Sequence, residues 1–203
     1  MPKTGLTQEQ LKERAIELTI ERMRKFGYEK VRLSDIARDL GVTHAALYSH
    51  FADKAALFDA VSQRWLVGID RKLEDVCNDV TANNDDAPTN SLQRITRWFL
   101  VLHRAKREKV QYDPEIFRAF NFSAQIEKEF VRCHMSSMDS QLKRLVKQAI
   151  DEGSVQGEIE DIVRILFTAT IEFHHPALVL QHIAEEQEQL LEQILAVVYK
   201  GLH

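Results

Sequence analysis

Apolar residues recur along this chain at the three- and four-residue spacing of amphipathic helices, and no segment sustains the alternation typical of a strand. The spacing predicts helices over about 8–26, 53–80, 91–109, 113–120, 123–152, from 158 until Pro176 interrupts it, and 184–199, with two short helices between residues 31 and 51. Residues 81–90 (TANNDDAPTN) predict a loop. We therefore expect an all-α chain of about nine helices.

The two short helices form the most informative stretch of the chain. The first has one apolar face, made of Leu33, Ile36, Ala37 and Leu40. Gly41 ends it, because glycine adopts a positive φ without strain. Thr43 can cap the second helix, which carries Leu47 and Phe51 on one side. Two helices joined by a short glycine turn form the unit that places its second helix in a DNA major groove. A plain pair of core helices is the structural alternative.

Capping residues mark the ends of other predicted helices. Thr7 with Gln10 makes a capping-box pattern at the start of the first helix. Asp53 is a good N-cap for the long helix that follows the motif. That helix is long enough to leave one domain and enter another.

The side of the second motif helix away from Leu47 and Phe51 is free to meet DNA. It offers His44, Ala45, Tyr48 and Ser49, with Thr43 at the helix start. Histidine and serine can hydrogen-bond a base edge or a phosphate, and the small side chains of Ala45 and Ala46 can touch a thymine methyl. His50 is better placed to meet the DNA backbone or to pack.

The segment LYSHFADKAALFDAV resembles the corresponding segment of TetR-type transcriptional repressors. The likeness rests on Leu47-Tyr48, Phe51, Asp53-Lys54 and Leu57-Phe58, together with the upstream Asp35-Ile36-Ala37 and Gly41-Val42-Thr43, and it is specific over about residues 7–65. The chain departs from the family at Arg32, where Ser or Thr is usual, so the cap of the first motif helix must come from Ser34 or be missing. Arg32 can instead reach a phosphate.

The resemblance implies a three-helix DNA-binding domain over residues 1–53 and a helical ligand-binding and dimerisation bundle over 54–203. It also implies that Tyr48 and Lys54 contact phosphates. The candidate DNA-binding residues are Arg32, Ser34, Thr43, His44, Ala45, Ala46, Tyr48, Ser49, His50 and Lys54.

The charge distribution is consistent with a protein that meets DNA by one end. The whole chain of 203 residues has a net charge of −4. Residues 1–54 hold ten Lys and Arg against eight Asp and Glu, a net +2, whereas residues 151–203 hold two against ten, a net −8. Such a separation favours docking through the N-terminal end.

The C-terminal half is rich in large apolar side chains, which favours an apolar cavity between bundle helices as an effector site. Ordinary core packing explains most of these residues equally well. The candidate ligand-binding residues are Trp98, Phe99, His103, Phe117, Phe120, His134, Met138, Phe167, Ile171 and His174. His174, His175 and His182 invite a metal site, but neighbouring histidines point ~100° apart on a helix and no Cys or acidic partner has ligand spacing. We expect no metal and no cofactor.

Two C-terminal helices are apolar over more than one packed face requires. We therefore expect them to pair with a second chain in a homodimer through Ile162, Leu166, Phe173, Leu191, Ile194, Leu195 and Val198.

Together these features predict a DNA-binding regulator, most simply a repressor that binds a palindromic operator and is released by a largely apolar molecule. A regulator controlled by a partner protein and an all-α enzyme are the alternatives. The sequence lacks a nucleophile–His–acid arrangement, a glycine-rich phosphate loop and an HExxH motif, which argues against the enzyme. No apolar run approaches a membrane helix and no signal peptide is visible, so we expect a cytoplasmic protein without membrane contact.

Overall fold

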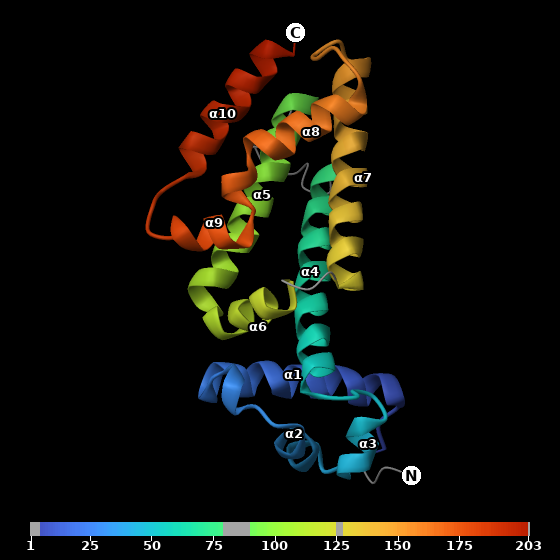
Figure 1. Cartoon of the computed structure of the whole chain (residues 1–203). Helices are drawn as coiled ribbons and strands as arrows, with labels where there is room; N and C mark the ends of the chain where they lie inside the picture. Colours follow the sequence, from blue (N-terminus) through green and yellow to red (C-terminus); the bar gives the residue numbers. More distant parts are fainter. Residues whose placement is uncertain (1–4, 79–89, 125–127, 203) are drawn as a thin grey trace. The chain divides into compact units, whose positions relative to one another are not determined.

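The computed structural model describes residues 5–78, 90–124 and 128–202, which form ten α-helices and two 3-10 helices (Figure 1). No strand occurs among these residues, so the all-α prediction is confirmed, with one helix more than expected. Contacts group the chain into two compact units. The first runs to Leu66 and includes Tyr112–Val131, and the second comprises Val67–Gln111 and the chain from Arg132 onward. The functional boundary at residue 53 stays a prediction.

The first unit begins with α1 (Gln8–Phe26), whose bounds are as predicted. Its N-terminus carries the expected capping box. The Thr7 side chain accepts the Gln10 N–H at 3.2 Å, and the Gln10 side chain accepts the Thr7 N–H at 2.9 Å. Two of the otherwise unpaired N–H groups at the helix start are therefore satisfied. The short 3-10 helix η1 (Tyr28–Lys30) follows.

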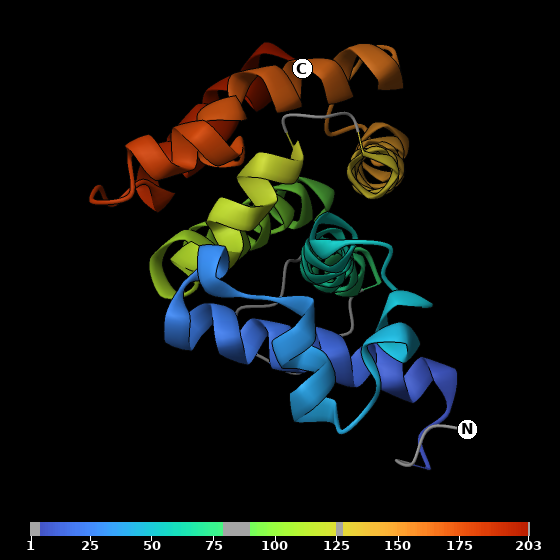
Figure 2. The same cartoon turned by 60° about the horizontal axis from the view of Figure 1, so that its bottom comes forward.

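The helix-turn-helix motif comprises α2 (Leu33–Leu40) and α3 (His44–Tyr48), which lie on one side of α1 (Figure 2). Gly41 ends α2 in the left-handed conformation, with a φ of 69°. The Val42 N–H then bonds the Ala37 carbonyl at 3.0 Å, which closes the turn. The apolar face predicted for α2 is buried against α1 and α3: Leu33, Ile36, Ala37 and Leu40 are all buried.

The first unit also contains α6 (Pro114–Ala124), on the side of α1 away from α2 (Figure 1). The Arg24 guanidinium of α1 donates to both carboxylate oxygens of Asp113, at 2.5 and 2.9 Å. One residue into α6, the Glu115 carboxylate accepts the Tyr28 N–H at 2.8 Å. Gly27 lies against this carboxylate with a φ of 85°, and a Cβ there would be 3.3 Å from Glu115 Oε2. Two acidic side chains thus hold α6 to the C-terminal end of α1.

The long helix α4 (Lys54–Cys77) belongs to both units, because its residues up to Leu66 lie in the first and the rest in the second. Asp53 caps it as predicted, accepting the Ala56 N–H at 2.7 Å. The second unit continues with α5 (Ser91–Tyr112), α7 (Glu129–Asp151), α8 (Ile159–Ala169), η2 (Ile171–Phe173), α9 (Pro176–Gln181) and α10 (Glu188–Gly201). Helices α8 and α10 pack on each other (Figure 1).

Several predicted helix boundaries were wrong, including the start of the last helix, which was expected at residue 184 and lies at Glu188. The helix expected from residue 123 begins at Glu129, and residues 123–124 still belong to α6. The helix expected from 158 ends at Ala169, because Thr170 leaves the helical conformation and the chain tightens into η2. Pro176 then starts α9 at the first helical position, where proline's missing N–H costs nothing. The predicted loop over 81–90 and the end of the fourth helix near Val80 lie outside the described residues, apart from Asn90.

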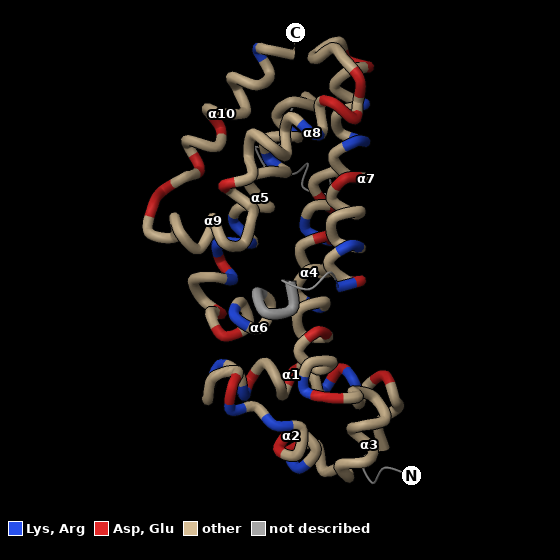
Figure 3. Tube along the Cα trace, viewed as in Figure 1, with Lys and Arg blue, Asp and Glu red and all other residues tan. Residues whose placement is uncertain are grey.

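The charge pattern seen in the sequence follows the helices. Figure 3 shows Asp and Glu outnumbering Lys and Arg along α8 to α10, whereas both signs alternate along α1 and α2. None of the described helices is both long enough and apolar enough to cross a membrane.

The bond between Arg24 and Asp113 gives a testable prediction. Asp113→Asn removes the charge but keeps an N-cap residue for α6. Since Asp113 is buried and Arg24 is half exposed, we expect the free energy of unfolding to fall by about 1 kcal/mol in urea denaturation. Asp161→Asn, which removes an exposed pair within α8, is the control and should change little. Equal stability of wild type and Asp113→Asn would contradict a role for this pair in holding α6.

Candidate nucleic-acid interface

The five-residue helix α3 presents one face to solvent and buries the other. Leu47 is fully buried, and Phe51 just beyond the helix is 2% exposed. Thr43 caps the helix as predicted, with its hydroxyl accepting the Ala46 N–H at 3.2 Å. The predicted DNA-facing residues then divide by exposure: Thr43, His44, Ala45, Tyr48 and Ser49 are exposed, while Ala46 and His50 are half-buried.

Three of the exposed residues are ordered by contacts with other residues of the α3 segment. The His44 and Tyr48 rings, one turn apart, meet edge to face with centroids 4.4 Å apart. Ser49 donates its hydroxyl to the Ala46 carbonyl at 2.8 Å, so its oxygen remains free to accept only. The exposed face therefore carries a histidine–tyrosine pair and a hydrogen-bond acceptor.

The residues flanking α3 include the cations expected to meet phosphate. Arg32 occupies the N-cap position of α2 without a side-chain cap bond, and both Arg32 and Ser34 are exposed. Lys54 is half-buried, donates to the Glu29 carbonyl at 2.8 Å and lies 5.1 Å from the centre of the Phe58 ring. Burial lowers the pKa of Lys54. The negative charge of Glu29 opposes this shift, and the positive charge of Arg32 adds to it. Lys54 thus fixes η1, a structural role that the sequence did not reveal.

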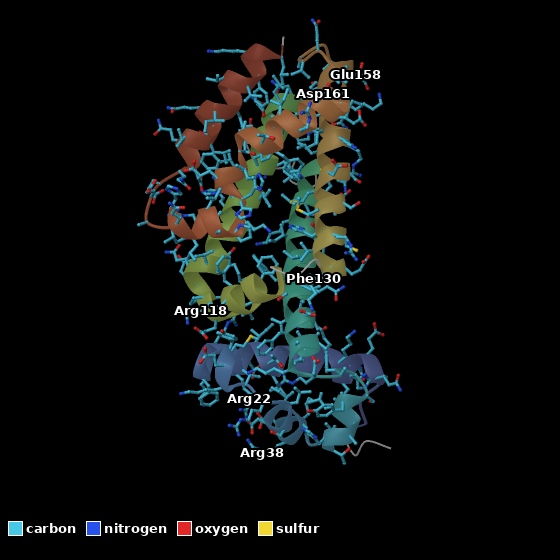
Figure 4. The ribbon with its side chains drawn as sticks, in the orientation of Figure 1. Arg22, Arg38, Arg118, Phe130, Glu158 and Asp161 are labelled. Carbon is cyan, nitrogen blue, oxygen red and sulfur yellow. The ribbon has the colours of Figure 1, made fainter. Side chains whose placement is uncertain are left out.

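An ionic network ties α2 to α1. Arg22 of α1 donates to Asp39 at 2.7 Å and lies 3.4 Å from Asp35 (Figure 4). Arg38 of α2 donates to Asp35 at 2.9 Å. The hydrogen bond from Arg22 holds the pKa of Asp39 below its ordinary value. These pairs orient α2, and through the turn they orient α3.

The interior of the second unit contains a series of hydrogen bonds between polar side chains that joins three helices. Nδ1 of His134 on α7 donates to the Asp70 carboxylate of α4 at 2.6 Å, and its Nε2 accepts from Lys106 of α5 at 3.1 Å. Burial lowers the pKa of His134 and lowers that of Lys106 to about 8. A neutral imidazole therefore bridges a carboxylate and an ammonium. Sequence analysis found His134 but missed both partners, because their helices meet only in the folded chain.

The second unit also has an open groove of about 400 Å³ between α7 and α8. Of the ten candidate ligand residues, Phe167, Ile171 and His174 line it. Behind them the side chains of Trp98, Phe99, His103, His134 and Met138 are buried. Phe117 and Phe120 belong instead to the first unit, where the Phe120 ring contacts Trp65 at 4.7 Å between centroids.

Most of the side chains predicted for the dimer contact are buried within the single chain, and their part in a dimer stays a prediction. Five of the seven are buried in the core of the chain itself: Ile162 and Leu166 of α8, Phe173 of η2, and Leu191 and Leu195 of α10. Ile194 and Val198 are half-buried. The large apolar side chains that α8 and α10 expose are Ile165, Leu190 and Val197, at 41%, 45% and 68%. The sequence showed that α8 and α10 are apolar on more than one face. It did not show which of these faces packs against the rest of the same chain.

No group of three or more His, Cys, Asp or Glu side chains with the arrangement of a metal site occurs among the described residues. Neither Cys77 nor Cys133 forms a disulfide.

Two family models match this chain. The model for the tetracyclin repressor-like C-terminal domain matches residues 91–195, more than half of the chain. The model for bacterial regulatory proteins of the tetR family matches residues 15–61, which include α2 and α3. No curated protein matches the chain significantly.

Solved structures share the fold over nearly the whole chain. A Rhodococcus sp. RHA1 protein of unknown function is 19% identical with a TM-score of 0.68, covering 100% of this chain and 98% of its own. A TetR/AcrR-family regulator from Thermobifida fusca YX-ER1 is 16% identical (TM-score 0.64; 95% and 98% covered). The regulator FadR from Bacillus subtilis, solved with stearoyl-CoA, is 11% identical (TM-score 0.62; 94% and 99% covered).

The family matches cover both the helix-turn-helix and the C-terminal helices, and the geometry of α2 and α3 agrees with them. The chain belongs to the TetR family of bacterial transcriptional regulators.

Proposed function

We propose that this regulator represses transcription by binding a palindromic operator as a homodimer, and that a largely apolar small molecule releases it. The observation that carries the DNA-binding part is the exposed face of α3, which offers His44, Tyr48 and Ser49 while Leu47 holds the helix in the core. Arg32, at the N-cap position of α2, adds an exposed cation whose side chain does not cap that helix. Base contacts then come from α3, and phosphate contacts come from Arg32, Tyr48 and Lys54.

The exposed apolar side chains of the C-terminal helices support the homodimer. Leu190, Ile194 and Val197 follow one another at i, i+4 and i+7, so they form one stripe along α10. Ile165 and Ala169 form a similar pair on α8, which packs beside α10. A stripe of this kind is stabilised when a second copy covers it. Two copies would supply the two recognition helices that a palindrome requires.

Contacts between α7 and α4 support a route from effector to DNA. Gln141 of α7 donates to the Asp70 carbonyl of α4 at 3.1 Å, beside the bond from His134 to the Asp70 carboxylate. One turn further along, Arg144 donates to Glu74 at 2.5 Å. A molecule that displaces α7 would therefore displace the part of α4 to which α7 is bonded, and α4 begins at Lys54, six residues after α3 ends at Tyr48. Release is then a population shift between two states that bind DNA differently.

The effector class is proposed from the lining of the groove, in which Met135, Val163, Phe167 and Ile171 are apolar. The Bacillus subtilis structure with stearoyl-CoA supports an effector with a large apolar part.

The DNA interface can be tested with two substitutions. Arg32→Ala should weaken binding to all DNA sequences and reduce the magnitude of the log–log salt slope by roughly 0.9, since one phosphate contact is lost. His44→Ala should change the preference between operator variants by about 1–3 kcal/mol at the affected base pair. Fluorescence anisotropy with labelled duplexes at several salt concentrations measures both effects.

Lys147→Ala is the matched control, because it removes an exposed cation from α7. It should leave DNA binding unchanged. If Arg32→Ala and His44→Ala also bind like wild type, α3 does not read DNA. Lys54→Ala is a less direct test, since the loss of its bond to Glu29 would also loosen η1.

The dimer can be tested on the exposed stripe of α10. Val197→Glu places a charge where a second copy would bury it, so sedimentation should show a shift from dimer to monomer and operator affinity should fall. Ala196→Glu is the matched control, since it adds the same charge at an exposed position about 100° around the helix. A wild type that sediments as a monomer yet binds a palindrome at full affinity would refute the homodimer.

A further inference from the structure

The groove between α7 and α8 has an apolar floor. Phe167 lines it and contacts the buried Trp98 and Phe99 rings, each with its centroid 6.0 Å from that of Phe167. Met135 and Ile171 lie at its sides and are about half exposed, at 51% and 47%. The volume of about 400 Å³ lies in the range of small-molecule sites. The groove therefore offers its occupant mainly apolar contacts.

The charged side chains at the groove neutralise one another. Lys143 of α7 lies 3.1 Å from Asp139 and 3.7 Å from Glu160. Arg164 of α8 donates to Asp161 at 2.7 Å. A charged ligand would have to compete with these pairs and would lose its own hydration as well. The rim thus favours an uncharged occupant.

His174 is an uncharged polar side chain in the lining of the groove, and its hydrogen bond to the backbone fixes its tautomer. Nε2 lies 3.4 Å from the Phe167 carbonyl oxygen, so Nε2 carries the hydrogen and donates it. Burial, opposed by the hydrogen bond to the Phe167 carbonyl and reinforced by the nearby Lys106, lowers the pKa of His174 to about 4, which keeps the imidazole neutral. Nδ1 is therefore left as an acceptor, and it makes no hydrogen bond to any residue the structure describes.

An acceptor in an apolar groove selects for a ligand that donates a hydrogen bond. A carboxylate or a thioester presents only acceptors, which Nδ1 of neutral His174 repels. Thr168 also lines the groove, but its hydroxyl both donates and accepts and so does not discriminate. We propose that the groove binds an uncharged apolar molecule that carries one hydroxyl group, such as an alkylated phenol, and that this hydroxyl donates to Nδ1 of His174. The identification of this molecule as the effector rests on the proposed function.

The proposal can be tested by calorimetric titration of the full chain with three probes that share one shape. The probes are 4-butylphenol, 4-butylanisole, which lacks the donor, and 4-butylbenzoate, which is an anion. One neutral hydrogen bond corresponds to a factor of about three to ten in affinity. We expect the phenol to bind more tightly than the anisole by this factor and the benzoate to bind most weakly.

Two substitutions at His174 and one beside it identify the acceptor. His174→Phe keeps an aromatic ring but removes Nδ1, so phenol and anisole should bind equally, at the anisole affinity of wild type. His174→Asn keeps an acceptor close to the position of Nδ1 and should retain the preference for phenol, which also covers the case in which His174→Phe fails to fold. His175→Phe, at the exposed neighbouring histidine, is the control and should match wild type.

Three results would overturn the proposal: equal affinities for phenol and anisole on wild type, tightest binding of the benzoate, or no binding of any probe. The last result would follow if a second chain covered the groove, which sedimentation would show. The titrations contain no DNA, so they do not depend on the proposed repressor function. Conversely, if operator DNA is bound and released by a molecule whose effect is the same on His174→Phe, the regulator function stands and this site assignment fails.

Discussion

The burial of Leu47 is the constraint on which the DNA-binding end of this protein depends. A helix of only five residues has little stability of its own, so tertiary contacts must hold α3 in place. Leu47 belongs to a core that includes Met23 of α1, Ile36 of α2, Phe51 between α3 and α4, and Leu57 of α4. Once this side chain is inside, His44, Tyr48 and Ser49 must face solvent. Packing at one position thus selects the surface that can meet a base edge.

The second unit is organised around the two faces of α7. One face is bonded to α4, through His134 and Gln141 at Asp70. The other face, at Met135, borders the groove against α8. Because helices move as rigid bodies, a ligand that shifts α7 would alter the contacts at Asp70 as well. The buried ammonium of Lys106 makes that link sensitive, since His134 cannot leave Asp70 without also leaving Lys106.

The sequence was informative wherever a signal is local. The capping box at Thr7, the glycine turn at Gly41 and the cap at Asp53 involve residues within a few positions of each other, and all three occur as predicted. Contacts between distant helices left no such signal. Three sets of hydrogen bonds join residues that only the fold brings together. They are the bond from Arg24 to Asp113, the bond that links Lys106 to His134, and the bond by which Lys54 holds η1. For the same reason, the apolar character of α8 and α10 was visible, but the face covered by the chain itself was not.

The central claim is that this chain reads DNA as a symmetric pair of recognition helices. Selection of bound duplexes from a random library, followed by measurement of the number of chains per duplex, tests it most directly. The account predicts enrichment of an inverted repeat whose half-sites are spaced so that both α3 helices enter the major groove on one side, with an even number of chains on each duplex. Enrichment of a sequence without two-fold symmetry, or binding of a single chain per site, would contradict it.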